Sequence, residues 1–254
     1  METGFTLDFG QSRTARIIRP QTEADLPSAF AFLELPRPSP VVVLIGGASR
    51  LSPSDQQLVR SLFSQVLSPL AQSLGAIVID GGTDVGIMQM MGCARHAQQA
   101  TFPLLGIAPV GCVALPNQPL LNDDMVYLEP HHTQFLLIPG DKWGAEAAWI
   151  ARVASLLAQK QPSVTVLING GEVSWLDAQE NVDEGRPLIT IAGSGRTADA
   201  LAKALDGNVT DARAQRIIAS GLVQAIELEQ GDRLTQVIHQ ILATPIYSDP
   251  LETP

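Results

Sequence analysis

The chain has 254 residues, of which 45% are hydrophobic and 17% charged, and its formal net charge is −10. This composition is globular, and the length suits one large α/β domain or two small ones. The chain has only three lysines and lacks the clustered cations that bind nucleic acid or an anionic membrane surface, so we expect neither partner. The negative net charge does not exclude a local pocket that binds an anion.

The two cysteines, Cys93 and Cys112, are too few and too far apart for a disulfide framework or a zinc site. Both stand in apolar company, so we expect core thiols. No basic segment followed by an apolar one opens the chain, and no apolar run approaches the roughly 20 residues that span a bilayer. A soluble, cytoplasmic protein is therefore expected.

The first 39 residues predict an extension ahead of the main fold. The segment "FTLDF" (5–9) alternates apolar and polar residues as an edge strand does, and 22–34 can form a short helix.

From residue 41 onward, apolar runs of strand length alternate with helical patterns. The run "VVVLI" (41–45) is continuous, which is typical of a strand covered on both faces. Ser52 and Pro53 start a helix that Gly75 ends. The expected strands are 41–45, 76–80, 104–110, 134–138, 163–169, 187–193 and 223–228. The expected helices are 52–75, 84–98, about 142–159, 195–205 and 230–243, and 111–125 is expected to be a loop.

This alternation predicts parallel βαβ units and therefore an α/β fold, a Rossmann-like doubly wound, mostly parallel sheet with helices on both faces. No repeat or linker stands out, so we expect one domain over residues 1–254. Its core spans about 40–243, with an N-terminal extension at 1–39. The proline-containing tail at 244–254 is expected to pack loosely.

Glycines recur where the predicted strands end. Ligands of an open parallel sheet bind beyond the carboxyl ends of its strands, and bare backbone N–H groups beside a helix N-terminus suit a phosphate. One such turn is weak evidence because glycine serves any tight turn, but six at one sheet edge predict a nucleotide-like pocket. The glycines are Gly46, Gly47, Gly81, Gly82, Gly111, Gly140, Gly170, Gly171, Gly193 and Gly195.

Three familiar motifs are missing from the sequence. No loop ends in Gly-Lys-Ser/Thr, and no strand-coupled Gly-x-Gly-x-x-Gly occurs, although "GSGRTAD" (193–199) is a near relative. Ser194 also lacks the Gly-x-Ser-x-Gly spacing of a hydrolase nucleophile.

Five motifs nevertheless occur in an order that matches a known family. They are "VIDGGTDVGIMQMMG" (78–92), "LLGIAPVG" (104–111), "LEPHHTQFLLIPGDKWGAE" (128–146), "VTVLINGG" (164–171) and "ITIAGSGRTADALA" (189–202). Together they resemble the SLOG superfamily, in particular the branch found at the N-terminus of melastatin-type TRP channels and in stand-alone prokaryotic proteins. The resemblance covers about residues 40–205. It implies a Rossmann-like fold and a pocket for a nucleotide-derived ligand such as ADP-ribose, NAD or an AMP-like molecule.

The resemblance also implies ligand-binding positions, motif by motif. The matching residues are Gly81, Gly82, Thr83 and Gly86 in the first turn, the pair His132 and Thr133, the step Trp143 and Gly144 with Glu146 two positions on, and Gly193, Ser194, Gly195 and Arg196 in the last motif. Asp199 in that motif is expected to cap or orient the turn, and Met88 is expected in the core.

Several of these residues have two interpretations. Arg196 can pair with a diphosphate, or be a surface arginine bonded to Asp199. His132 can hydrogen-bond in or beside the pocket, or be a satisfied structural histidine. Trp143 can stack on a base or cover the sheet edge. Although two histidines are adjacent, no cysteine or carboxylate stands at metal spacing, so we expect no metal.

The superfamily also contains the Lonely Guy phosphoribohydrolases, which cleave N-glycosidic bonds of nucleotides. Their signature resembles "PGDKWGAEAAW" (139–149), with Glu146 near the catalytic glutamate. Asp141 replaces a phosphate-contacting glycine, however, and "HHTQ" stands where an arginine segment belongs. The channel-type helix arginine also has only an out-of-register counterpart, Arg152.

These departures favour binding or sensing of a nucleotide derivative without turnover. The alternative is an N-glycosidic-bond hydrolase that uses Glu146 as its catalytic residue. A third interpretation is a structural or partner-binding domain with vestigial glycines. Because superfamily members often self-associate, a homo-oligomer stays open.

Overall fold

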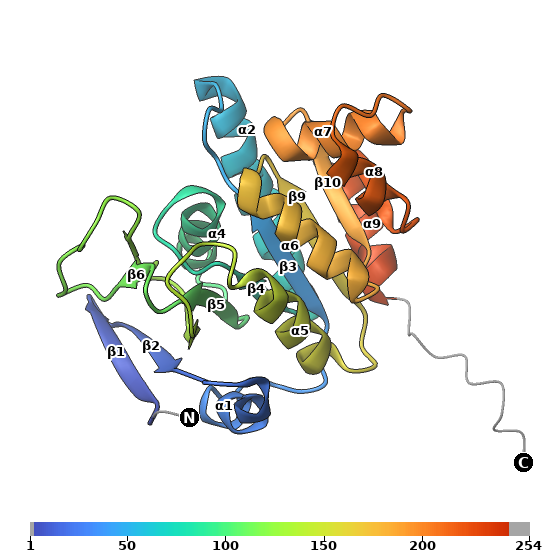
Figure 1. The fold of residues 1–254 in the computed structure, drawn as a ribbon. Helices are drawn as coiled ribbons and strands as arrows, with labels where there is room; N and C mark the ends of the chain where they lie inside the picture. The colour runs from blue at the N-terminus through green and yellow to red at the C-terminus, as the bar shows by residue number, and fades with distance from the viewer. Residues whose placement is uncertain (1–2, 244–254) are drawn as a thin grey trace, which may run out of the picture.

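The structure is a computed structural model, and it describes residues 3–243; the predicted loose tail at 244–254 lies outside the described residues. One nine-stranded sheet has the order β1-β2-β8-β5-β4-β3-β9-β10-β11 (Figure 1). Its strands are β1 (Phe5–Gly10), β2 (Arg13–Ile18), β3 (Val41–Gly46), β4 (Ile77–Asp80), β5 (Leu104–Pro109), β8 (Gln134–Ile138), β9 (Ser163–Ile168), β10 (Leu188–Ala192) and β11 (Val223–Glu227). Only β1 and β2 pair antiparallel among these nine strands, so the expected mostly parallel, Rossmann-like α/β fold is confirmed.

Helical segments connect the strands and cover both faces of the sheet (Figure 1). They are η1 (Glu23–Asp25), α1 (Leu26–Phe32), α2 (Pro53–Leu62), the π-helical turn η2 (Phe63–Leu67), α3 (Ser68–Leu74), α4 (Gly86–Ala97), α5 (Ala147–Ala158), α6 (Glu172–Asp183), α7 (Arg196–Leu205), α8 (Ala212–Ile218) and α9 (Gly231–Ala243). Ser52 caps α2 by accepting from the Asp55 backbone N–H at 3.1 Å, and Gly75 ends α3 in the left-handed conformation, as the sequence predicts.

The central strand β3 explains why its sequence is apolar throughout. Val41, Val43 and Ile45 point to the core formed with α1, α5, α6, α7 and α8. Val42 and Leu44 point to the opposite core, formed with α2, α3, α4 and α9. A strand covered on both faces has no solvent side, so every position favours a hydrophobic residue.

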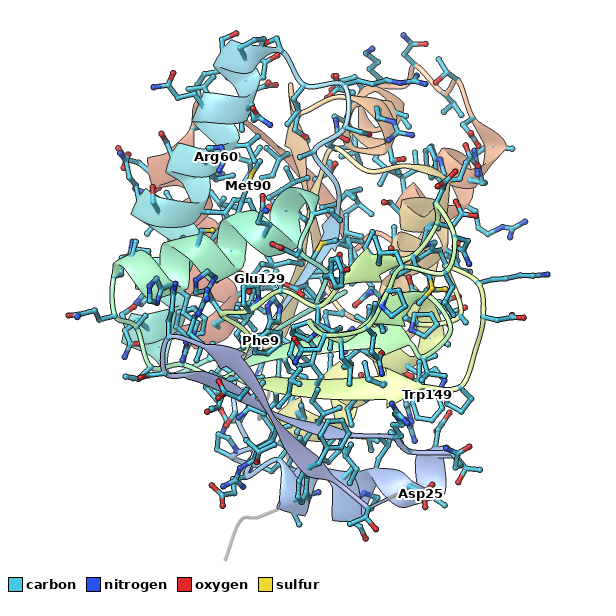
Figure 2. All side chains as sticks on the ribbon, turned by 90° about the vertical axis from the view of Figure 1, so that its left-hand side faces the viewer. Phe9, Asp25, Arg60, Met90, Glu129 and Trp149 are labelled. Atoms are coloured by element: carbon cyan, nitrogen blue, oxygen red, sulfur yellow. The ribbon has the colours of Figure 1, made fainter. Side chains whose placement is uncertain are left out.

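The N-terminal segment confirms the predicted edge strand. Strand β1 lies at the sheet edge and pairs only with β2, which pairs with β8. Phe9 of β1 packs toward Phe135 of β8, with ring centroids 6.3 Å apart, on the face turned to the viewer in Figure 2. The predicted short helix at 22–34 corresponds to η1 and α1.

Four sequence predictions need correction. Helix α5 begins at Ala147 rather than near residue 142, because 141–146 form turns at the sheet edge. No helix was expected where α6 and α8 lie. The expected loop at 111–125 contains β6 (Val113–Ala114), which pairs with β7 (Val126–Tyr127) in a separate two-stranded sheet. Cys93 is exposed rather than a core thiol, whereas Cys112 is buried.

Candidate functional site

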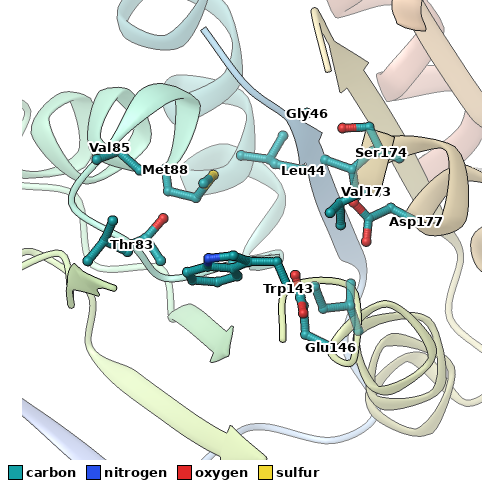
Figure 3. A pocket seen from close by; sticks show the side chains of 14 residues that line it. Leu44, Gly46, Thr83, Val85, Met88, Trp143, Glu146, Val173, Ser174 and Asp177 are labelled. Atoms are coloured by element: carbon teal, nitrogen blue, oxygen red, sulfur yellow. The ribbon is translucent and has the colours of Figure 1, made fainter. Parts of the chain in front are cut away.

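The chain direction across the sheet reverses between β3 and β9. From β3 the chain builds outward through β4, β5 and β8, and it then returns to add β9, β10 and β11 on the other side. A doubly wound sheet binds its ligands at such a reversal, beyond the carboxyl ends of the strands. A cavity of about 260 Å³ opens at this place (Figure 3). Its lining residues are Leu44, Ile45, Gly46, Gly81, Thr83, Val85, Met88, Val126, Trp143, Glu146, Ile150, Val173, Ser174 and Asp177.

Gly46, the last residue of β3, is required by the close approach of β3 and β9. Its φ is +125°, and a Cβ atom there would lie 2.0 Å from the backbone oxygen of Ile168. Backbone atoms of a paired strand cannot move aside cheaply, so only glycine fits at this position. The glycine at the end of β3 therefore shapes the floor of the cavity.

The cavity walls are mostly apolar. Trp143 comes from the turn after β8, and Figure 3 shows its indole facing Met88 of α4 across the opening. The Trp143 Nε1–H donates to the backbone oxygen of Asp124 at 3.0 Å, which fixes the plane of the ring. Met88, which we expected in the core, is half-buried and lines this wall.

Two carboxyl groups lie among these apolar walls. Glu146 precedes α5 and is 6% exposed, and its Oε2 accepts from the Gly144 backbone N–H at 2.8 Å. Asp177 projects from α6 and is 7% exposed. Burial raises the pKa of Glu146, and backbone hydrogen bonds oppose that rise. Burial, with the nearby charges of Glu146 and Glu180, raises the pKa of Asp177 well above its usual value.

A second hollow of about 410 Å³ adjoins the cavity and shares Gly46, Val85 and Met88 with it. It is also lined by Gly47, Ala48, Ser49, Gln56, Arg60, Gly86, Gln89 and Met90. The Arg196 Nη1 donates to the Ser49 Oγ at 2.5 Å, which holds this guanidinium beside the hollow. Two arginines thus flank glycine backbone, an arrangement that suits a phosphate.

The structure brings many of the predicted residues to this edge. The cavity contains Gly46, Gly81, Thr83, Trp143 and Glu146, and the second hollow adds Gly47 and Gly86. Gly111 and Trp143 line a third hollow of about 270 Å³. A Cβ atom at Gly171 would lie 3.1 Å from the Arg196 guanidinium.

Other predicted residues support the turns. A Cβ atom at Gly82 would lie 2.7 Å from the Gly106 Cα, and one at Gly170 would lie 2.9 Å from the Ser174 side chain. A Cβ atom at Gly140 would meet that of Ala145 at 3.0 Å. Gly144 takes a φ of +99° in the turn that carries Trp143.

The last glycine motif is organised by its own side chains. Ser194 is buried, and its Oγ accepts from the Asn169 backbone N–H at 2.7 Å. The backbone N–H groups of Gly193 and Gly195 donate to Asp199 Oδ1 at 2.8 and 3.0 Å. Asp199 therefore orients this turn, as expected. Within residues 3–243, the Arg196 guanidinium bonds Ser49 rather than Asp199.

Neither residue of the predicted pair His132 and Thr133 lines the cavity. The Thr133 Oγ1 accepts from the Leu104 backbone N–H at 2.9 Å, so it sits where β5 and β8 begin. That is the amino end of the strands, opposite the cavity. His132 is 1% exposed and bridges Asp80 Oδ1 at 2.9 Å and Glu129 Oε2 at 2.8 Å. The structural interpretation of His132 therefore applies.

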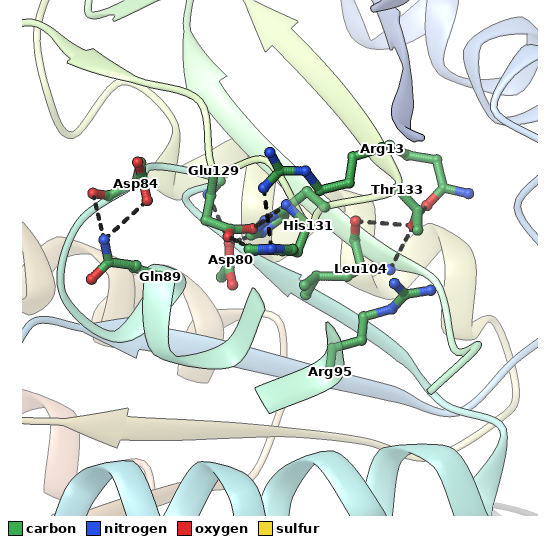
Figure 4. A network of polar contacts seen from close by, with 12 residues as sticks. Arg13, Asp80, Asp84, Gln89, Arg95, Leu104, Glu129, His131 and Thr133 are labelled. Carbon is green, nitrogen blue, oxygen red and sulfur yellow. Dashed lines mark hydrogen bonds and ion pairs between the residues drawn. The ribbon is translucent and has the colours of Figure 1, made fainter. Parts of the chain in front are cut away.

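His131 belongs to the same polar network (Figure 4). Its Nδ1 lies 2.5 Å from Glu129 Oε1, and its ring stacks on His96 with centroids 4.5 Å apart. The fold also brings the exposed Cys93 close, so that donor atoms of Cys93, Glu129 and His131 lie within 4.8 Å of one another. Sequence spacing did not indicate this cluster, because its members come together only through tertiary structure.

Residues 39–236 match the model of the family described as "SLOG in TRPM, prokaryote". The chain belongs to this family. It is 22% identical to a transient receptor potential cation channel subfamily M member-like 2 of Nematostella vectensis, over 92% of this chain and 18% of that protein. It is 29% identical to a transient receptor potential channel of Caenorhabditis elegans, over 68% of this chain and 10% of that protein.

A similar fold occurs in a solved structure. The X-ray structure of a structural genomics target, TM1055, superposes with a TM-score of 0.52 at 20% identity, covering 80% of this chain and 99% of that one. The chain spans only about a tenth to a fifth of the length of the two channel relatives named above. Within residues 3–243, none of the helices combines the length and apolarity that crossing a bilayer needs.

Sequence reasoning on this SLOG chain missed Asp177, Arg60 and Ser49. Arg60 and Ser49 stand outside the glycine motifs and reach the site only through α2 and the turn before it. Asp177 lies on the unpredicted helix α6. One signal for Asp177 was available in the sequence. A helix that follows the Gly170-Gly171 turn starts at the carboxyl edge of the sheet, and Asp177 lies about one and a half helical turns after those glycines.

Proposed function

We propose that this SLOG chain binds a nucleotide-derived ligand of the ADP-ribose or NAD type and holds it without turnover. The observation that carries the proposal is the juxtaposition of an apolar, tryptophan-walled cavity and an arginine-flanked glycine hollow at the sheet's reversal point. An aromatic ring fits the first and a phosphate the second, and a nucleotide carries both. The channel activity named for the relatives is not part of the proposal.

Each part of the site has a physical role in this proposal. Trp143 offers a flat face on which a ring stacks. Gly46 and Gly47 carry no side chains, so phosphate oxygens can approach the backbone closely there, while the Gly47 N–H itself donates to the Ile168 backbone oxygen at 3.0 Å. Arg196 and Arg60 supply local positive charge in a chain whose net charge is −10, and Arg196 can pair two oxygens at once.

Absence of turnover is supported by the residues at the Lonely Guy-like segment. Asp141 stands exposed in the turn after Gly140, where a carboxylate repels phosphate. The "HHTQ" segment supplies no cation to the cavity, because His132 is enclosed by two carboxylates and Thr133 lies at the other edge. Arg152 is committed on the surface, at 3.4 Å from Glu23.

One observation favours a second candidate, N-glycosidic-bond hydrolysis. Glu146 and Asp177 both line the cavity, and hydrolysis of a glycosidic bond commonly uses two carboxyl groups, one as an acid and one to stabilise the oxocarbenium-like transition state. Burial raises the pKa of Glu146, which favours the acid role.

Calorimetry with ADP-ribose, NAD and AMP tests the proposal, with chromatography of the same mixtures for free base. We expect binding of at least one ligand, loss of affinity in Arg196→Ala, and no free base. Arg216→Ala, an exposed arginine on α8, is the matched control and retains affinity. Absence of binding for all three ligands contradicts the proposal. Base release that Glu146→Gln abolishes establishes the hydrolase instead.

A further inference from the structure

Asp177 is a buried acid whose carboxyl group is not fully hydrogen-bonded within the fold. Its side chain lines the cavity, and its Oδ1 has no hydrogen-bond partner among residues 3–243. A buried polar atom without a partner costs stability, so each such atom in a native protein calls for an explanation. A ligand that donates a hydrogen bond to the carboxyl supplies one.

Among residues 3–243, none of those that line the cavity around Asp177 is a cation. Arg213 bonds Glu172 at 2.6 Å and Asp211 at 2.8 Å, and its Cζ lies 4.7 Å from the ring centroid of Trp175. The other polar side chains that line the cavity are Glu146, Thr83 and Ser174, and the Ser174 Oγ accepts from the Gly171 backbone N–H at 3.1 Å. Burial and the neighbouring carboxylates raise the pKa of Asp177, which agrees with an acid that has no cationic partner.

The rest of the cavity defines the shape of the missing partner. Figure 3 shows the carboxyl groups of Glu146 and Asp177 turned into the same end, while Trp143 and Met88 form the walls. The volume of about 260 Å³ lies just below the range of ordinary ligand pockets, so it suits a ring rather than a whole dinucleotide. A flat ring with a hydrogen-bond donor on its edge matches both the walls and the acidic end.

We propose that Asp177 determines specificity for an amino-substituted heteroaromatic ring, such as the aminopurine of an adenine nucleotide, by accepting a hydrogen bond from the exocyclic amino group. This inference rests on the proposed function, and it names the part of the ligand that enters the cavity. A carboxylic acid that keeps its proton also donates to a ring nitrogen, so the group can pair with the acceptor–donor edge of such a ring in two places.

The test compares AMP and ADP-ribose with analogues whose purine lacks the amino group, by calorimetry on the full chain. Sites built to bond an amino group reject analogues that lack it. We expect the wild type to bind the amino ligands at least tenfold more tightly. Asp177→Leu, similar in shape but without oxygens, removes this preference. Asp183→Leu, at an exposed position on the same helix, is the matched control and keeps it.

Each outcome decides a separate statement. Binding of AMP or ADP-ribose with no preference for the amino group, or with a preference that survives in Asp177→Leu, overturns the role of Asp177 and leaves the proposed function standing. Absence of binding for every nucleotide overturns the proposed function and this inference together. Adenosine, tested alongside, shows whether the ring alone suffices or the phosphate is needed. Unfolding of Asp177→Leu, followed thermally, verifies that the variant is folded, and we expect a midpoint no lower than that of the wild type.

Discussion

Because of the buried His132, we expect the free energy of unfolding of this chain to fall as the pH rises into the alkaline range. Its imidazole is 1% exposed and lies between Asp80 and Glu129, with nitrogen–oxygen distances of 2.9 and 2.8 Å. Burial alone lowers the pKa of His132, but the two carboxylates outweigh burial and raise it from 6.5 to about 9. The histidine is therefore protonated in the folded protein at neutral pH.

The size of the effect follows from the two pKa values. A tenfold change in proton affinity corresponds to about 1.4 kcal/mol, so protonated His132 adds about 3 kcal/mol to the free energy of unfolding. Because the folded pKa lies above the unfolded one, this contribution is fully present below pH 6.5. It is lost as the pH rises from 6.5 through about 9.

The assay is urea unfolding between pH 6 and 9.5 of the wild type, His132→Gln and the control His239→Gln, which changes an exposed histidine. The wild type and the control should lose about 3 kcal/mol more than His132→Gln over this range. An NMR titration of His132 in the wild type measures its pKa directly, should the variant not fold. Equal pH dependence in all three proteins, or an NMR midpoint near 6.5, refutes the reasoning.

Further predictions concern the ligand site and its frame. Arg196→Ala should weaken a phosphate ligand by about 1.5–3 kcal/mol, and Trp143→Ala should weaken a stacked base by about 1–3 kcal/mol; unchanged calorimetric affinity removes the residue from the site. Gly46→Ala should cost about 4 kcal/mol or more of unfolding free energy, because its Cβ would lie 2.0 Å from a backbone oxygen of β9. Gly207→Ala has a similarly positive φ of +86° but open space, and should cost only about 1–3 kcal/mol; equal losses contradict the steric argument. Glu146→Gln should gain stability over the wild type as the pH rises above about 4.5, since burial raises the pKa of Glu146; thermal unfolding at pH 4 and 7.5 checks the sign.

The strand framework could be predicted because its cause is local. Each core strand is an apolar run bounded by glycine or proline, and a strand buried on both faces has no other pattern available. Helix α6 was not predicted because several residues on its buried face are polar. Ser174, Asp177 and Asn181 are buried beside Trp175 and Ala178, and Asn181 Oδ1 accepts from the Thr165 hydroxyl at 2.9 Å. Hydrophobic periodicity cannot reveal a face whose buried positions are polar.

The gathering of glycines at one sheet edge could be predicted from the strand framework, but the other residues that join them there could not. Glycines after parallel strands must gather at one edge, and Gly46, Gly81 and Gly86 line the cavities there. Thr133 shows the limit of motif transfer. It directly precedes β8, so the rule for parallel strands already assigns it to the amino end, even though the resemblance implies a ligand contact. One partner of His132, Glu129, lies only three residues away, but Asp80 could not be predicted as the other because it lies 52 residues away.

The most direct test is a crystal structure of the full chain grown with ADP-ribose. The expected result is ring density between Trp143 and Met88, with the amino edge toward Asp177 and a phosphate beside Arg196. Density for ADP-ribose elsewhere on the molecule, or an empty cavity at a ligand concentration that saturates binding in solution, contradicts it.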